Sequence, residues 1–172
     1  MVQPATKRGP SGARQDPFTG DEWALLRLAP ALVSGGVGAA DPTGLFTSIE
    51  QATAGVQGTV RAYRRSGRRL KLFDALAADS SVPGLPDAKT LLGEGSSEQQ
   101  MGHFKTAALE RVKAAVDLVA RKGSPAEAQA YRHMIVAMVE KVANAVNERA
   151  FVAEVQRAAG IPLKGTRACR SA

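Results

Sequence analysis

Residues 97–146 decide the fold class of this chain, and they read SEQQMGHFKTAALERVKAAVDLVARKGSPAEAQAYRHMIVAMVEKVANAV. Apolar residues recur at spacings of three and four on both sides of Gly123, which is the period of one face of an α-helix. Gly123 is a typical helix terminator, and Ser124–Glu127 has the residue types of a capping box with proline at the first helical position. We expect two consecutive helices, the first capped by Ser97 with Gln100. The inward positions are Met101, Phe104, Ala108, Val112, Ala115, Val116 and Val119, then Ala128, Tyr131, Ile135, Met138, Val139, Val142 and Val146.

The residue pattern of the N-terminal half also predicts helices. Residues 19–22, Thr-Gly-Asp-Glu, are typical of a helix start, because two acids face the positive end of the helix dipole. Pro30 should kink or divide the apolar run that follows, and the glycines of residues 35–38 either weaken it or let another helix approach closely. Helices over 45–65 and 68–78 come next. Their inward positions are Leu45, Phe46, Ile49, Ala52, Thr53, Val56, Val60 and Tyr63, then Leu70, Phe73, Leu76 and Ala77.

These patterns predict an all-α protein with five to seven helices in a compact bundle of two antiparallel halves. No stretch of the 172 residues alternates with the period of two that a half-buried strand needs. We expect one domain over residues 19–162, with halves of about 19–78 and 97–160 joined by an irregular loop. Residues 1–18 are predicted to be a disordered tail, and residues 163–172 a basic tail.

The formal net charge of +7 is concentrated in one internal segment and the two tails, while the rest of the chain is mildly acidic. The internal segment, which we call the basic cluster, has two interpretations. It could bind an anionic partner, either nucleic acid or an acidic protein, or it could be a solvated helix end favoured by the helix dipole. Tyr63 and Phe73 lie beside it, but we interpret both as core residues because they fall on the apolar stripes. The basic cluster comprises Arg61, Arg64, Arg65, Arg68, Arg69 and Lys71.

The sequence offers little that would support catalysis or a cofactor. The single cysteine, Cys169, excludes a disulfide framework and a cysteine-based zinc site. His103 and His133 fall on different predicted helices without the spacing of a metal site. We therefore expect neither an enzyme nor a bound cofactor. No apolar run is long enough for a membrane span, and we expect a cytoplasmic protein.

Asp41 and Glu50 are the candidate metal ligands. A carboxylate in a turn and a second one in the following helix supply oxygen atoms of the kind that a hard cation prefers, although calcium takes six or more oxygen ligands. The alternative, which we prefer on these residues alone, is that Asp41 closes the turn before Pro42 and that Glu50 is solvated.

Three short stretches carry a family resemblance. Residues 23–33 read WALLRLAPALV, and they are followed by Ala39-Ala40-Asp41 and then by Ile49-Glu50. This arrangement resembles the TerB-like helical family linked to tellurite resistance, and related uncharacterised bacterial helical proteins. The resemblance implies an all-α bundle of two pseudo-repeated halves, in which acidic residues bind metal. Residues 139–160 resemble a second, degraded copy of the motif.

The sequence thus favours a non-enzymatic helical-bundle protein that acts by binding or scaffolding. One alternative is a binder of nucleic acid or of an acidic partner through the basic cluster. Another is a TerB-like module for a divalent cation or a stress response, which would use Asp41 and Glu50. The oligomeric state and the identity of the partner stay open at this point.

Overall fold

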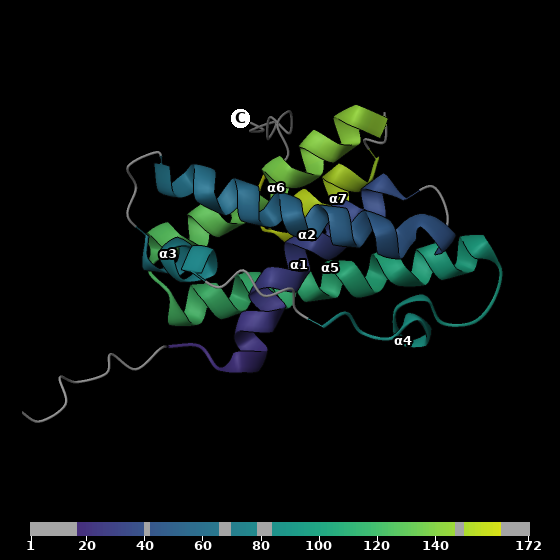
Figure 1. Cartoon of the computed structure of the whole chain (residues 1–172), viewed down its shortest axis with the longest axis horizontal. Coiled ribbons are helices and arrows are strands. Elements are labelled where there is room, and N and C mark those ends of the chain that lie inside the picture. Colours follow the sequence, from purple (N-terminus) through teal and green to yellow (C-terminus); the bar gives the residue numbers. More distant parts are fainter. Residues whose placement is uncertain (1–16, 40–41, 66–69, 79–83, 147–149, 163–172) are drawn as a thin grey trace, which may run out of the picture.

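The computed structural model describes residues 17–39, 42–65, 70–78, 84–146 and 150–162 (Figure 1). Within these ranges the chain forms helices and no strand, so the prediction of an all-α bundle is confirmed, and the number of helices lies within the predicted five to seven. None of these helices combines the length and the hydropathy that crossing a bilayer requires. The helices are α1 (Gly20–Gly38), α2 (Pro42–Arg65), α3 (Lys71–Ala78), α4 (Ala88–Leu92), α5 (Ser97–Lys122), α6 (Pro125–Val146) and α7 (Ala150–Ala158).

Helix α1 forms the centre of the bundle. Every residue from Leu28 to Val37 is buried, and α1 packs against α2, α5 and α6. Figure 1 shows α1 (purple to dark blue) passing through the middle of the molecule. A helix that is apolar on all sides has to be covered on all sides. The two halves that we predicted therefore share α1, which contacts α2 from its own half and both long helices of the other.

Pro30 lies inside α1 without dividing it. The helix continues through Pro30 to Gly38, so the expected division does not occur. Proline has no N–H, and the carbonyl of Leu26, four residues earlier, therefore loses its usual helical donor. The hydroxyl of Tyr131 in α6 donates a hydrogen bond of 2.8 Å to that carbonyl oxygen. A side chain from another helix thus supplies the donor that the backbone of α1 lacks.

The glycines of α1 permit close helix packing. A Cβ atom added at Gly35 would lie 2.7 Å from the Cα of Ile49 in α2, and one added at Gly36 would lie 2.5 Å from Cε1 of Phe104 in α5. Real Cβ atoms do not approach other heavy atoms so closely. Of the two interpretations of residues 35–38, close approach is therefore confirmed at Gly35 and Gly36, and the helix extends through both.

Two of the predicted helix starts are confirmed in detail. At α1, the side chain of Thr19 accepts a hydrogen bond from the N–H of Glu22, and the carboxylate of Glu22 accepts one from the N–H of Thr19. At α6, Ser124 and Glu127 form the same reciprocal pair, with distances of 3.2 Å and 2.8 Å. Each capping box satisfies backbone donors that the first turn of a helix leaves free.

Three other helix starts are shifted from the prediction. Helix α2 begins at Pro42 rather than at residue 45. The N-cap of α5 is Ser96, which pairs with Gln99, and not Ser97 with Gln100. Ser96 has the extended backbone that an N-cap needs, while Ser97 is already helical. Helix α3 begins at Lys71 rather than at residue 68, and residues 66–69 lie outside the described part of the chain. Its buried side chains include Leu72, which the predicted stripe omitted.

The N-terminal end of the described chain packs onto the bundle. Phe18 belongs to the predicted disordered tail, but it is 7% exposed, and its ring contacts Trp23 edge to face with centroids 4.9 Å apart. An ion pair of 2.6 Å between Lys122 and Glu22 ties the end of α5 to the start of α1. Ordered packing thus begins before residue 19. The remainder of both predicted tails, residues 1–16 and 163–172, lies outside the described residues.

Candidate functional site

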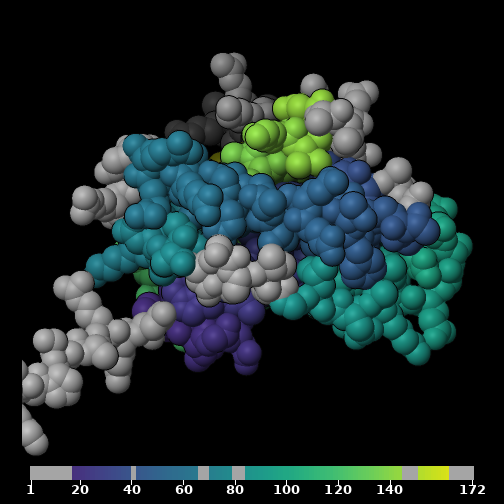
Figure 2. Space-filling view, viewed as in Figure 1, coloured from purple at the N-terminus to yellow at the C-terminus, as the bar shows by residue number. Residues whose placement is uncertain are grey.

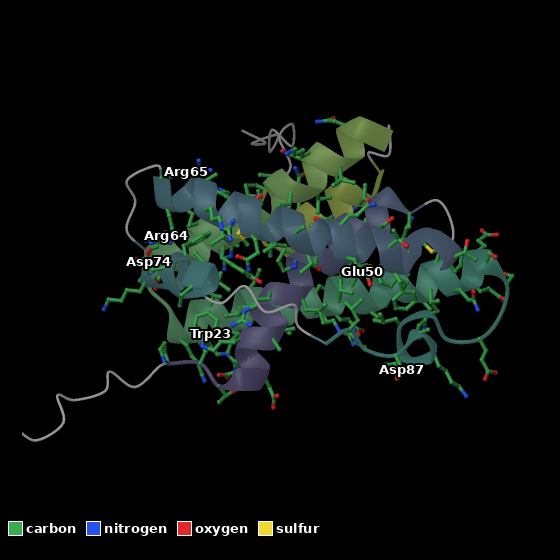
Figure 3. The ribbon with its side chains drawn as sticks, viewed as in Figure 1. Trp23, Glu50, Arg64, Arg65, Asp74 and Asp87 are labelled. Atoms are coloured by element: carbon green, nitrogen blue, oxygen red, sulfur yellow. The ribbon has the colours of Figure 1, made fainter. Side chains whose placement is uncertain are left out.

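Part of the basic cluster lies where α2 ends and α3 begins (Figure 3). Cations are favoured at the end of α2 because the carbonyl end of a helix carries partial negative charge. Arg68 and Arg69 lie outside the described residues. The described members of the basic cluster, which we call the basic corner, are all exposed, and they are Arg61, Arg64, Arg65 and Lys71.

Arg64 joins α2 to α3 through an ion pair. Its Nε lies 2.9 Å from Oδ1 of Asp74, and both side chains are about half exposed, at 52% and 49%. Figure 3 shows the two residues facing each other beside the end of α2, with Arg65 farther along the helix. A pair this exposed is worth about 0–1 kcal/mol. Its main consequence is that one cation of the basic corner is already neutralised.

The two aromatic rings near the basic corner stack on each other. The ring centroids of Tyr63 and Phe73 are 4.8 Å apart, with an angle of 19° between the ring planes. Phe73 is buried and Tyr63 is partly buried. Phe73 therefore lies in the core as predicted, and Tyr63 packs against the core. Their mutual stacking occupies one face of each ring, so that face is not available to a base of single-stranded nucleic acid.

Glu127 connects the start of α3 to the start of α6. Its Oε1 accepts a hydrogen bond of 2.9 Å from the N–H of Leu72, while its Oε2 accepts one from Ser124. Partial burial raises the pKa of Glu127, but the backbone donors, the Ser124 hydroxyl and the nearby charge of Lys71 together hold this pKa below its ordinary value. A carboxylate that is charged at neutral pH therefore anchors the helix that carries Lys71.

Only one of the two predicted metal ligands, Glu50, lies among the described residues. Glu50 is exposed on α2, where Figure 3 labels it, and Asp41 lies outside the described residues. His103 and His133 are exposed on α5 and α6. Within the described ranges, no three His, Cys, Asp or Glu side chains gather in a group that could hold a metal ion.

Comparison of the chain with protein-family models, with curated proteins and with solved structures found no match. The resemblance to the TerB-like family stays a prediction. The helices and side chains of this chain therefore carry the functional argument alone.

Sequence reasoning missed the acid that pairs with the basic cluster. Asp74 lies three residues beyond Lys71, outside the segment in which we counted charges. A signal was present, because Asp74 falls in the predicted helix over 68–78, which follows a short break after Arg65. Two helices joined by so short a connection lie side by side, which brings Asp74 within reach of the end of α2.

Proposed function

We propose that this protein acts by binding rather than by catalysis, and that the basic corner is its surface for an acidic protein partner. The observation that carries the proposal is the exposure of Arg61, Arg65 and Lys71, which form no ion pair with a described residue. Arg61 and Arg65 lie one helical turn apart near the end of α2, and Lys71 begins α3. We further propose that the protein works in the cytoplasm as a binding or scaffolding module.

An acidic protein segment suits the basic corner better than nucleic acid does. The guanidinium group of arginine makes paired hydrogen bonds with carboxylates as well as with phosphates. Phe73 is buried, and one face of the Tyr63 ring is already stacked on it, which leaves little aromatic surface for an unpaired base. The chain outside the basic cluster and the tails is mildly acidic, so a long duplex lying across the bundle would meet repulsion beyond the corner.

The test is the affinity of the full chain for a fluorescent glutamate-rich peptide, measured by anisotropy over a range of salt concentrations. We expect the double variant Arg61→Gln/Arg65→Gln to bind about tenfold more weakly, because each lost surface charge pair is worth up to about 1 kcal/mol. Affinity of the unmodified protein should fall as salt rises, because exposed charges are screened.

The matched control is Lys113→Gln/Arg157→Gln, which removes the same charge from exposed positions on α5 and α7. It should leave the affinity nearly unchanged. Equal weakening in both double variants would show a response to net charge and would overturn the proposal, as would binding that is independent of salt. A short DNA duplex serves as the competing probe, and tighter binding of the duplex than of the peptide would reassign the corner to nucleic acid.

A further inference from the structure

A groove of about 400 Å³ lies between α2 and α6, along residues 48–59 of α2, and α1 contributes to its lining. Figure 2 shows α6 (light green) beside α2 (blue) on the face that is in view. Small residues create the space. Ala52 and Gly55 line the groove from α2, and a Cβ atom added at Gly55 would meet no other heavy atom within 4 Å. The volume falls in the range of small-molecule sites, about 300–1,000 Å³.

Ser34 of α1 lines this groove and is 1% exposed. Its hydroxyl has no hydrogen-bond partner among the described residues. A serine within a helix normally bonds to a backbone carbonyl one turn earlier, and a buried hydroxyl without a partner destabilises the fold. A ligand in the groove with an acceptor atom within reach of this hydroxyl would remove the destabilisation. The unpartnered hydroxyl of Ser34 therefore points to a ligand, and it does so independently of the groove's shape.

The rest of the lining indicates the chemistry of that ligand. Met138 and Val142 supply apolar surface from α6, while Ser48, Gln51 and Thr59 of α2 add polar groups beside its small residues. Lys141 is the one charged side chain among the described residues that line the groove, and it is exposed. An apolar wall with one cation beside it suits a molecule that has an aliphatic body and a single negative charge.

We propose that this groove binds a small aliphatic monocarboxylic acid. The aliphatic chain lies along Gly55, Met138 and Val142, and the carboxylate lies near Lys141. One carboxylate oxygen accepts a hydrogen bond from the hydroxyl of Ser34. This site is separate from the basic corner, and neither proposal depends on the other.

Octanoate is the probe that tests the proposal, with heteronuclear NMR shifts and the melting temperature of the full chain as readouts. Binding to the folded state alone raises the melting temperature as the ligand concentration rises. Gly55→Leu should abolish octanoate binding, because the added side chain fills the groove without meeting a neighbour at its Cβ. The matched control is Gly58→Leu. Its Cβ also enters open space on α2, but residue 58 does not line the groove, so binding should persist.

Two further variants test the polar contacts. Lys141→Met should weaken octanoate binding about tenfold, because it removes a charge-assisted contact. Ser34→Ala should also weaken binding, while it leaves the melting temperature of the free protein unchanged or higher, since it removes an unsatisfied hydroxyl. A merely structural role for Ser34 would lower that melting temperature instead.

Three results would overturn the proposal. One is that octanoate causes no saturable shift at millimolar concentration. Another is that Gly55→Leu binds octanoate as well as Gly58→Leu does, which would place the ligand elsewhere. The third is that octyltrimethylammonium, which has the opposite charge on a comparable chain, binds as tightly as octanoate, which would exclude a carboxylate site at Lys141.

Discussion

The hydroxyl of Tyr131 donates a hydrogen bond of 2.8 Å to the carbonyl oxygen of Leu26, which Pro30 leaves without its helical donor. The two residues are 105 positions apart in the sequence. Tyr131 is fully buried, and burial raises its pKa far above the ordinary value, so the phenol stays protonated and able to donate. This bond couples the central helix to α6 at the position where a proline would otherwise weaken α1.

Tyr131→Phe should destabilise the protein by about 1–3 kcal/mol, because it leaves the carbonyl of Leu26 buried without a donor while keeping the ring in the core. Urea unfolding followed by circular dichroism measures the change. A loss well below this range would mean that the carbonyl finds another partner.

The companion experiment is a double-mutant cycle with Pro30→Ala. Alanine restores an N–H at position 30 that can donate to Leu26, so Tyr131→Phe should cost less in this background than in the unmodified protein. Equal costs in both backgrounds would contradict the compensation between Pro30 and Tyr131.

Gly35→Ala should destabilise the protein by about 1–3 kcal/mol. The added methyl group would lie 2.7 Å from the Cα of Ile49, and a backbone atom cannot move aside as a flexible side chain can. The control is Gly55→Ala, where the added methyl group meets nothing within 4 Å. That change should stabilise α2 by about 0.5–1 kcal/mol, because alanine is the better helix former. If both substitutions had the same sign, close packing would not be the reason for glycine at position 35.

The stability of the protein should depend on the charge of Glu127 in acid. The pKa of Glu127 is lowered in the folded protein, so its contribution is fully present above the unfolded value of 4.5 and is lost as the pH falls through the folded pKa. We expect the free energy of unfolding to decrease over this interval. Chemical denaturation at several pH values from about 6 downward measures the effect.

Glu127→Gln isolates this contribution from the other carboxylates. Glutamine can still accept the hydrogen bond from Leu72, but it does not titrate. The variant should therefore be less stable than the unmodified protein at neutral pH, and the two should converge at low pH. A constant difference across the whole pH range would show that the charge of Glu127 is not involved.

Local signals predicted the helices well because caps and apolar periodicity depend on neighbouring residues. Ser124 and Glu127 form the capping box that their residue types suggested. The stripe of α5 is buried as expected from Phe104 to Val119, while Met101 is only partly buried. The error at the start of α5 has a local cause too. Ser96 and Ser97 stand side by side, each three residues before a glutamine, and residue types alone do not distinguish them.

What the sequence could not reveal depends on contacts between distant segments. The pattern around Pro30 carries no sign that Tyr131, on another helix, supplies the missing donor. Similarly, the unpartnered hydroxyl of Ser34 and the open space beside Gly55 exist only because α1, α2 and α6 pack as they do. The apolar stripes indicate which helix faces turn inward, whereas the groove between α2 and α6 depends on how these helices cross.

Asp74→Asn tests the basic corner in the opposite direction, because it should strengthen peptide binding where removal of the arginine charges should weaken it. The substitution releases Arg64 from its ion pair and removes a negative charge from α3, the helix that carries Lys71, so affinity for a glutamate-rich peptide should rise severalfold. Stability should fall by no more than about 1 kcal/mol, because the pair is half exposed.

Asp117→Asn is the matched control, since it makes the same charge change at an exposed position on α5. Anisotropy titrations of the two variants at equal salt concentration decide the question. A gain in affinity for Asp74→Asn alone would support local recognition at the basic corner, whereas equal gains would show that the peptide responds to net charge.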